Sequence, residues 1–89
     1  DLSLEELARA CAVEPQWIVE RIEAGILGDG SIHIESWRFT SQDLTRARRM
    51  WQMERDFDAV PELAALVADL LEEVARLKGR IKAAGLTVD

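Results

Sequence analysis

The feature that most constrains this 89-residue chain is an apolar repeat near its C-terminal end. The repeating residues are alternately four and three positions apart, with Val or Ile at one heptad position and Leu at the other: Leu63, Val67, Leu70, Val74, Leu77 and Ile81. This pattern predicts an amphipathic helix whose narrow apolar stripe packs against another helix. Three heptads are marginally stable alone, and a domain this small gains stability by association. We therefore expect a homodimer with this stripe, the heptad seam, as its interface.

The N-terminal third carries signals for two short helices. Ser3 followed three residues later by Glu6 is a capping box, which predicts the start of a helix. Pro15 suits the first position of a second helix, and Gly25 can adopt the left-handed conformation just past its end. Two short helices joined by a tight turn indicate a helix-turn-helix.

The middle of the chain changes from helical to strand-like patterning. A turn-forming segment at 28–31 is followed by β-favouring residues in short alternating runs: Ile32, Ile34, Trp37 and Phe39. These residues predict a small two-stranded wing. Thr40 then caps a third helix with Asp43, and its apolar positions from Leu44 to Phe57 predict burial on two sides.

The last helix is bounded by Pro61, which suits a first helical position, and by Gly85, which suits a helix end. We interpret residues 1–58 as a winged helix-turn-helix head, residues 59–85 as a dimerisation helix of the same domain, and residues 86–89 as a flexible tail.

Charge is distributed unevenly along the chain. Residues 1–37 carry a net charge of −6, residues 38–55 of +3 and residues 56–89 of −3. A duplex-binding domain normally presents a basic face, because phosphate neutralisation supplies most of its non-specific affinity. The acidic N-terminal part therefore makes nucleic acid an unexpected partner.

The order of these elements resembles the MerR-type winged helix-turn-helix over nearly the whole chain. Within that superfamily the chain looks most like the CbpM family of chaperone modulators. The resemblance rests on Trp37-Arg38-Phe39 in the wing, on Arg46 to Arg49 with Arg55 in the third helix, and on the run from Leu70 to Lys78 with its acidic pair Glu72-Glu73. It implies a mainly α fold with a two-stranded wing and a long C-terminal coiled-coil helix.

One departure from the DNA-binding MerR proteins concerns the second helix. There the family has an Arg-Tyr-Tyr or similar run just before the segment that corresponds to Gly25-Ile26-Leu27, and the matching positions here are Val19, Glu20 and Arg21. Val19 cannot donate a hydrogen bond, and Glu20 places a negative charge where a phosphate would lie. A fold does not carry its commonest activity with it, so DNA binding does not follow from the scaffold.

The resemblance implies protein binding instead. CbpM-type proteins bind the J-domain of a DnaJ-like co-chaperone, CbpA, and interfere with its stimulation of the Hsp70 ATPase. A J-domain presents a basic second helix, which an acidic surface would attract and orient. The candidate partner-binding residues are Glu14, Trp17, Glu20, Glu23, Asp29 and Glu35, with Trp17 as a possible aromatic anchor.

Simpler interpretations exist for the same residues. Acids on a helix are usually a solvated face, and Trp17 can be a packing residue. We expect Trp37 and Trp51 to hold the wing against the third helix. For Arg46, Arg48 and Arg49 we expect a solvated, salt-bridged face, with Asp43 near Arg46.

The remaining chemistry-bearing residues predict neither an enzyme nor a cofactor or metal site. Cys11 is the only cysteine and His33 the only histidine, which gives no metal-ligand spacing. The sequence has no glycine-rich phosphate loop and no recognisable catalytic set. A lone cysteine in an apolar run fits a packed thiol in a reducing compartment, and no apolar run is long enough to span a bilayer, so we expect a cytoplasmic protein.

Two alternatives stay open. One is a MerR-like DNA-binding transcription regulator that uses Arg21, Arg38 and the Arg46–Arg49 cluster. The other is a scaffold that only assembles with neighbours through its coiled coil.

Overall fold

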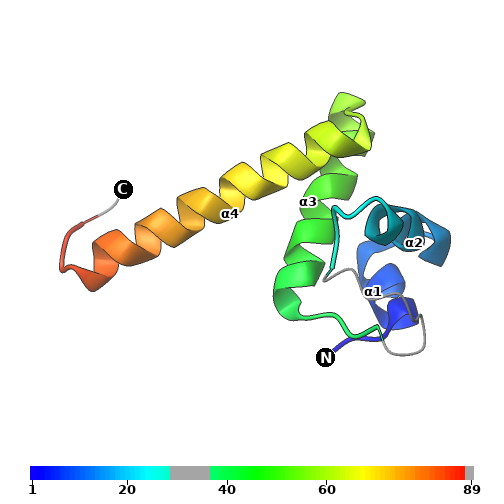
Figure 1. The fold of residues 1–89 in the computed structure, drawn as a ribbon, viewed down its shortest axis with the longest axis horizontal. Coiled ribbons are helices and arrows are strands. Elements are labelled where there is room, and N and C mark those ends of the chain that lie inside the picture. Colours follow the sequence, from blue (N-terminus) through cyan, green and yellow to red (C-terminus); the bar gives the residue numbers. More distant parts are fainter. Residues whose placement is uncertain (29–36, 88–89) are drawn as a thin grey trace.

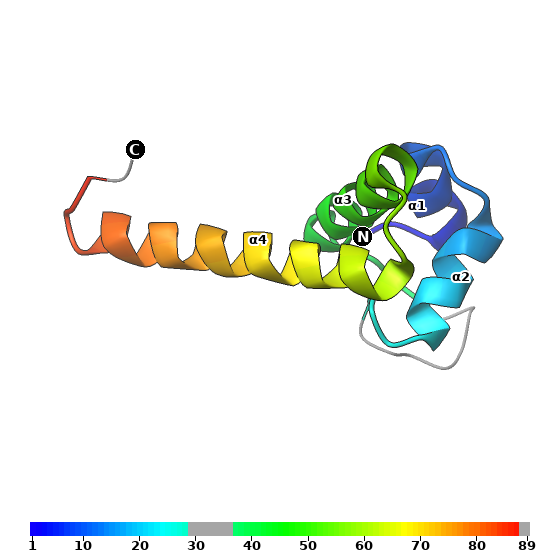
Figure 2. The ribbon, with the colours of Figure 1, turned by 90° about the horizontal axis from the view of Figure 1, so that it is seen from above.

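The computed structural model describes residues 1–28 and 37–87. Within these residues the chain forms four helices: α1 (Leu4–Cys11), α2 (Pro15–Glu23), α3 (Ser41–Phe57) and α4 (Pro61–Ala83). The first three helices make up a head, and α4 projects from it as a single long helix (Figures 1 and 2). The predicted mainly α architecture is confirmed.

The predicted helix starts are confirmed by reciprocal capping bonds. At α1 the Glu6 N–H donates to Ser3 Oγ at 3.1 Å and the Ser3 N–H donates to Glu6 Oε1 at 2.8 Å. At α3 the Asp43 N–H donates to Thr40 Oγ1 at 3.2 Å and the Thr40 N–H donates to Asp43 Oδ2 at 2.9 Å. Each box satisfies amide groups that the first helical turn leaves without intrahelical partners.

Prolines and glycines also take their predicted places at helix ends. Pro15 and Pro61 occupy the first turns of α2 and α4. Gly25 follows α2 with a φ of 77°, and Gly85 follows α4 with a φ of 80°. The turn between α1 and α2 instead places Ala12 in the left-handed region, with a φ of 57°, and the Val13 N–H donates to the Ala8 carbonyl at 3.0 Å.

The head is built around a core to which α1, α2, α3 and the segment preceding α3 contribute. Its buried residues are Leu4, Leu7, Ala8, Cys11, Ile18, Ile22, Leu27, Trp37, Phe39 and Ala47. Burial raises the pKa of the Cys11 thiol, because the thiolate is poorly solvated there. Cys11 is therefore the packed thiol that the sequence predicts.

A second, smaller core joins α3 to α4. It consists of Met50 on α3 with Ala64, Ala65 and Ala68 on α4, all nearly inaccessible to solvent. The small alanine side chains let the two helices approach closely. The face of α4 that meets the head is therefore an alanine face, which the heptad pattern did not reveal.

The heptad seam lies on the opposite side of α4, because its residues are about half a helical turn away from the alanine face. Five of its six side chains are exposed, from 38% for Ile81 to 57% for Leu70, and Val67 is half-buried. Both views show α4 extending well beyond the head (Figures 1 and 2). The seam is thus available to a partner.

The predicted wing falls largely on residues 29–36, which lie outside the described residues, as do Ile32 and Ile34. The described residues contain no β-strand. Phe39 forms an isolated antiparallel bridge with Leu2, with backbone hydrogen bonds of 2.7 and 2.9 Å, so this residue pairs with the chain's N-terminal segment.

The prediction that Phe57 of α3 is buried is wrong. Phe57 is 70% exposed, because α3 ends there and the chain turns into α4 through Asp58, whose φ is 55°. The apolar face of α3 is covered only as far as the neighbouring helices reach.

Candidate functional site

The outward face of α2 carries the acidic side chains that the sequence singles out. Ile18 and Ile22 point into the head core and are 0% and 5% exposed. Glu14, Glu20 and Glu23 are exposed, and we call these three residues the acidic face of α2. The other two candidate acids, Asp29 and Glu35, lie outside the described residues.

Trp17 is fixed in place by three contacts. Its indole N–H donates to Glu54 Oε1 at 3.1 Å. Its ring meets the Trp51 ring edge-on, with centroids 5.8 Å apart, and the Arg21 guanidinium carbon lies 4.3 Å from the Trp17 ring centroid. Trp17 is therefore a half-buried residue that packs between α2 and α3.

This contact also gives Trp51 a role that the sequence did not predict. Among the described residues that side chain packs against Trp17 of α2, so it joins α3 to α2. Trp37, by contrast, is buried at 7% exposure and meets Phe39 edge-on, with ring centroids 6.5 Å apart.

Arg21 is bound by the Glu54 carboxylate within the head. Its Nη2 donates to Glu54 Oε1 at 2.6 Å and its Nε donates to Glu54 Oε2 at 3.3 Å. The two side chains are only 11% and 12% exposed. A two-pronged bond of this kind is strong and geometrically specific, so Arg21 could meet a phosphate only by leaving Glu54 unpaired.

The two neighbours of Arg21 are also unsuited to phosphate contact. Val19 is half-buried and packs against the head core. Glu20 is 57% exposed and accepts a hydrogen bond from Arg21 Nη1 at 3.1 Å. The positions that match the DNA-contacting run of MerR proteins therefore present no free cation among them.

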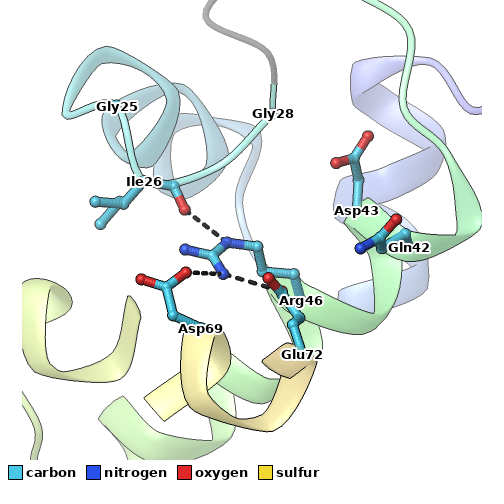
Figure 3. A pocket seen from close by; sticks show the side chains of 8 residues that line it. All are labelled: Gly25, Ile26, Gly28, Gln42, Asp43, Arg46, Asp69 and Glu72. Atoms are coloured by element: carbon cyan, nitrogen blue, oxygen red, sulfur yellow. Dashed lines mark hydrogen bonds and ion pairs between the residues drawn. The ribbon is translucent and has the colours of Figure 1, made fainter. Parts of the chain in front are cut away.

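Arg46 lies at the junction of three elements (Figure 3). Its Nε donates to the Ile26 carbonyl at 2.9 Å, and its Nη1 donates to Asp69 Oδ1 at 2.8 Å and to Glu72 Oε2 at 2.9 Å. Burial acts to lower the pKa of this guanidinium, but the hydrogen bonds and charges of Glu72 and Asp69 outweigh it, so the pKa is raised. Arg46 is therefore a structural joint between the segment after α2, α3 and α4.

The predicted proximity of Asp43 to Arg46 is not realised as an ion pair. The Asp43 carboxylate accepts from the Thr40 N–H, and Figure 3 shows it apart from the Arg46 guanidinium. Arg48 donates to the Ala10 carbonyl at 3.3 Å, and Arg55 pairs with Asp56 at 2.9 Å. Arg46, Arg48 and Arg55 of α3 thus contact protein groups within the same chain, whereas Arg49 makes no hydrogen bond or ion pair with the described residues.

Three surface depressions lie beside α2 or the segment that follows it. The most apolar in composition, of about 350 Å³, is lined by Ala12, Val13, Glu14, Trp17 and Trp51. A second, of about 280 Å³, is lined by Glu20, Arg21, Ala24, Ile26, Pro61 and Glu62. The third, of about 340 Å³, surrounds the Arg46 joint and includes Gly25, Gly28, Gln42 and Asp43 (Figure 3).

Residues 1–28 and 37–87 contain no cluster of three or more His, Cys, Asp and Glu side chains with suitable placement to hold a metal, and His33 lies outside them. No helix in the described part of the chain is both long enough and apolar enough to cross a membrane.

Comparison with known proteins identifies the family. A sequence profile described as "MerR HTH family regulatory protein" matches residues 2–84. The chain belongs to the MerR HTH family. No solved structure is significantly similar to it.

Two curated relatives narrow the similarity within this family. Both are named chaperone modulatory protein CbpM. The protein from Pseudomonas entomophila (strain L48) is 27% identical over 77 residues, which cover 86% of this chain and 76% of that protein. The protein from Pseudomonas putida (strain W619) is 29% identical over 77 residues, with the same coverage. The resemblance to CbpM-type MerR-like proteins is confirmed.

The structure also adds three acids that the sequence reasoning missed. Glu54 holds both Trp17 and Arg21, and Asp69 and Glu72 hold Arg46. Glu54 is 33 residues from Arg21, so no local pattern could pair them. Asp69 and Glu72 lie three positions apart on α4, which places them on one helix face. This spacing was the sequence signal that could have indicated a shared cationic partner.

Proposed function

We propose that this chain is a non-catalytic chaperone modulator that binds the J-domain of a DnaJ-like co-chaperone and inhibits its stimulation of Hsp70. The proposal starts from the similarity to proteins named chaperone modulatory protein CbpM. It makes the chain a cytoplasmic homodimer that joins through the heptad seam of α4.

The observation that carries the proposal is the pairing of charges on α2. Glu14, Glu20 and Glu23 are exposed. Arg21, the cation among them, is held by the Glu54 carboxylate, and both side chains of that ion pair are largely buried. The helix that would read DNA therefore presents negative charge to a partner. A basic helix such as the second helix of a J-domain would be attracted and oriented by this face.

The test is a titration of the purified chain with a cognate J-domain. The paired substitutions Glu20→Arg and Glu23→Arg should weaken binding about tenfold or more, since they replace attraction by repulsion at two sites. The matched control carries Asp1→Arg and Glu5→Arg, which change the net charge equally on exposed residues outside α2. Binding should also weaken with added salt.

Two results would contradict the proposal. One is the absence of J-domain binding at tens of micromolar. The other is equal binding by the α2 variant and its charge-matched control, since attraction would then depend only on net charge.

The alternative function is DNA-binding transcription regulation, which the family description permits. A duplex gel shift separates the two. A DNA binder would retain duplex with a steep salt dependence. We expect no retention at moderate salt, because Arg21 and Arg46 are both paired with carboxylates of the same chain.

A further inference from the structure

The apolar depression beside the start of α2 suggests how a partner is held. It is lined by Ala12 and Val13 from the α1–α2 turn, by Glu14 at the start of α2, and by Trp17 and Trp51. Four of these five residues are apolar, and the single charged one is acidic. We call this the Trp17–Trp51 depression.

The walls of the depression are rigid before any partner arrives. Trp17 is held by Glu54, by the Arg21 guanidinium and by the edge of Trp51. The turn is closed by the Val13 N–H bond to the Ala8 carbonyl. Groups that are already ordered lose little conformational entropy on binding, which favours affinity.

The charge at the rim selects the kind of partner. Glu14 is the N-cap residue of α2, yet its side chain makes no capping hydrogen bond, and it is exposed. Glu23 and Glu20, the latter also paired with Arg21, add exposed carboxylates along the same helix. An apolar side chain flanked by Lys or Arg therefore fits this depression, and one flanked by Asp or Glu does not.

We propose that the Trp17–Trp51 depression receives one apolar side chain of a basic amphipathic helix, whose neighbouring Lys or Arg pairs with Glu14. Trp17 is then the wall of a receptacle, in place of the inserted anchor that the sequence suggests. This inference deepens the proposed function and rests on it for the choice of the J-domain as one probe. The depression fixes where on the head the partner helix lies.

The experiment uses two probes on the full chain. The first is a cognate J-domain, and the second is a synthetic helical peptide of Leu and Lys, with a Leu and Glu peptide of the same pattern as its charge-inverted control. The peptides lack Trp, so a change in Trp fluorescence comes from the chain itself, in which Trp17 and Trp51 line the depression and Trp37 is buried in the head core.

The two key substitutions are Ala12→Asn and Glu14→Gln. Asn tolerates the left-handed backbone of Ala12, so the fold should survive while a polar group enters the depression. Ala12→Asn should weaken both probes about tenfold, because the amide must lose water without gaining a partner. Glu14→Gln should weaken them about threefold, as expected for a rim charge pair.

The controls repeat each substitution outside the depression. Ala10→Asn introduces the same amide on the exposed side of α1, and Glu5→Gln removes an exposed carboxylate from the first turn of α1. Both should change binding by less than about twofold.

The outcomes separate this inference from the proposed function. J-domain binding that Ala12→Asn leaves unchanged would overturn the depression as the docking site while leaving the chaperone role intact. Peptide binding that Ala12→Asn weakens, with no J-domain binding, would support the depression and overturn the chaperone role. Binding of neither probe at about 100 µM would overturn both.

One further result would overturn the inference. If Ala12→Asn changed the dimer dissociation constant but neither probe's affinity, the occupant of the depression would be a second copy of this chain.

Discussion

At the scale of single residues, the capping box of α1 makes the stability of the head depend on pH. The Ser3 backbone N–H and then its hydroxyl group stabilise the ionised Glu6 carboxylate, which lowers the pKa of Glu6 below its ordinary value. A carboxyl group whose pKa is lowered by folding stabilises the fold above its unfolded-state pKa. That contribution is lost as the pH falls through the folded-state pKa.

We therefore expect Glu6→Gln to lower the free energy of unfolding at pH 7, since Gln keeps an accepting oxygen but not the charge. The difference from the wild type should shrink below about pH 4 and vanish near about pH 2, where Glu6 is protonated in both states. Urea unfolding followed by circular dichroism at several pH values measures it.

The matched control is Glu5→Gln. Glu5 is an exposed acid in the same first turn, so it shares the favourable interaction with the helix dipole but is not part of the capping box. If both variants show the same pH profile, the effect comes from the dipole and the capping box contributes nothing measurable.

Residue-scale features were predictable from the sequence where their causes are local. The capping boxes at Ser3 and Thr40 each join residues three positions apart, so the sequence contains the whole interaction. The role of Trp17 was not predictable, because it is set by Glu54, 37 residues away, and by Trp51 on another helix. Candidate binding residues are harder to assign than caps for this reason.

At the scale of elements, Arg46 fixes α4 to the rest of the head. Its guanidinium reaches the Ile26 carbonyl after α2 and two carboxylates on α4, while its side chain is only 15% exposed (Figure 3). The alanine face of α4 packs against Met50 beside it. We infer that this joint contributes substantially to holding α4 on α3.

Replacing Arg46 by Met should lower the free energy of unfolding by about 2 kcal/mol, the scale of a lost set of charged hydrogen bonds that leaves carboxylates without their partner. Arg46→Lys should recover only part of this loss, because an ammonium group cannot reproduce the forked geometry of a guanidinium. Urea unfolding at neutral pH measures both variants.

Arg55→Met serves as the control for this joint. Arg55 pairs with Asp56 on the surface of α3, and its side chain is 57% exposed. Its removal should leave the free energy of unfolding nearly unchanged, as is usual for exposed ion pairs. Equal losses for Arg46→Met and Arg55→Met would show that the joint is no stronger than a surface pair.

Element boundaries were mostly predictable, because Pro15, Gly25, Pro61 and Gly85 determine backbone conformation directly. The extent of burial along each helix was less predictable. Periodicity placed Phe57 on the covered face of α3, but the covering helix does not reach it. The predicted wing lies largely outside the described residues. Phe39, which belongs to its described part, pairs with Leu2.

At the scale of the whole molecule, α4 has two faces in different surroundings. Ala64, Ala65 and Ala68 are buried against α3, whereas Leu70 and Leu77 are 57% and 43% exposed on the opposite side. A contiguous exposed apolar stripe of this kind is a feature of interaction surfaces. The heptad spacing indicates a helix as its occupant, and a second copy of α4 supplies one.

We therefore expect the wild-type chain to be a dimer and the variant with Leu70→Asp and Leu77→Asp to be a monomer of 10.0 kDa. Two charges placed in the seam would have to be buried without partners in a dimer, which costs more than the association can offset. Analytical ultracentrifugation over a range of concentrations distinguishes the two states, and circular dichroism checks that the head stays folded.

The control for this prediction carries Ala75→Asp and Ala83→Asp. It adds the same two charges to exposed positions of the same helix, away from the seam. Because that surface faces solvent beyond the head, this variant should remain dimeric. A monomeric control would mean that net charge alone separates the copies. A dimeric seam variant would mean that the chains associate through another surface, and the acidic faces of the two heads would then have a different relative placement from the one that α4 pairing imposes.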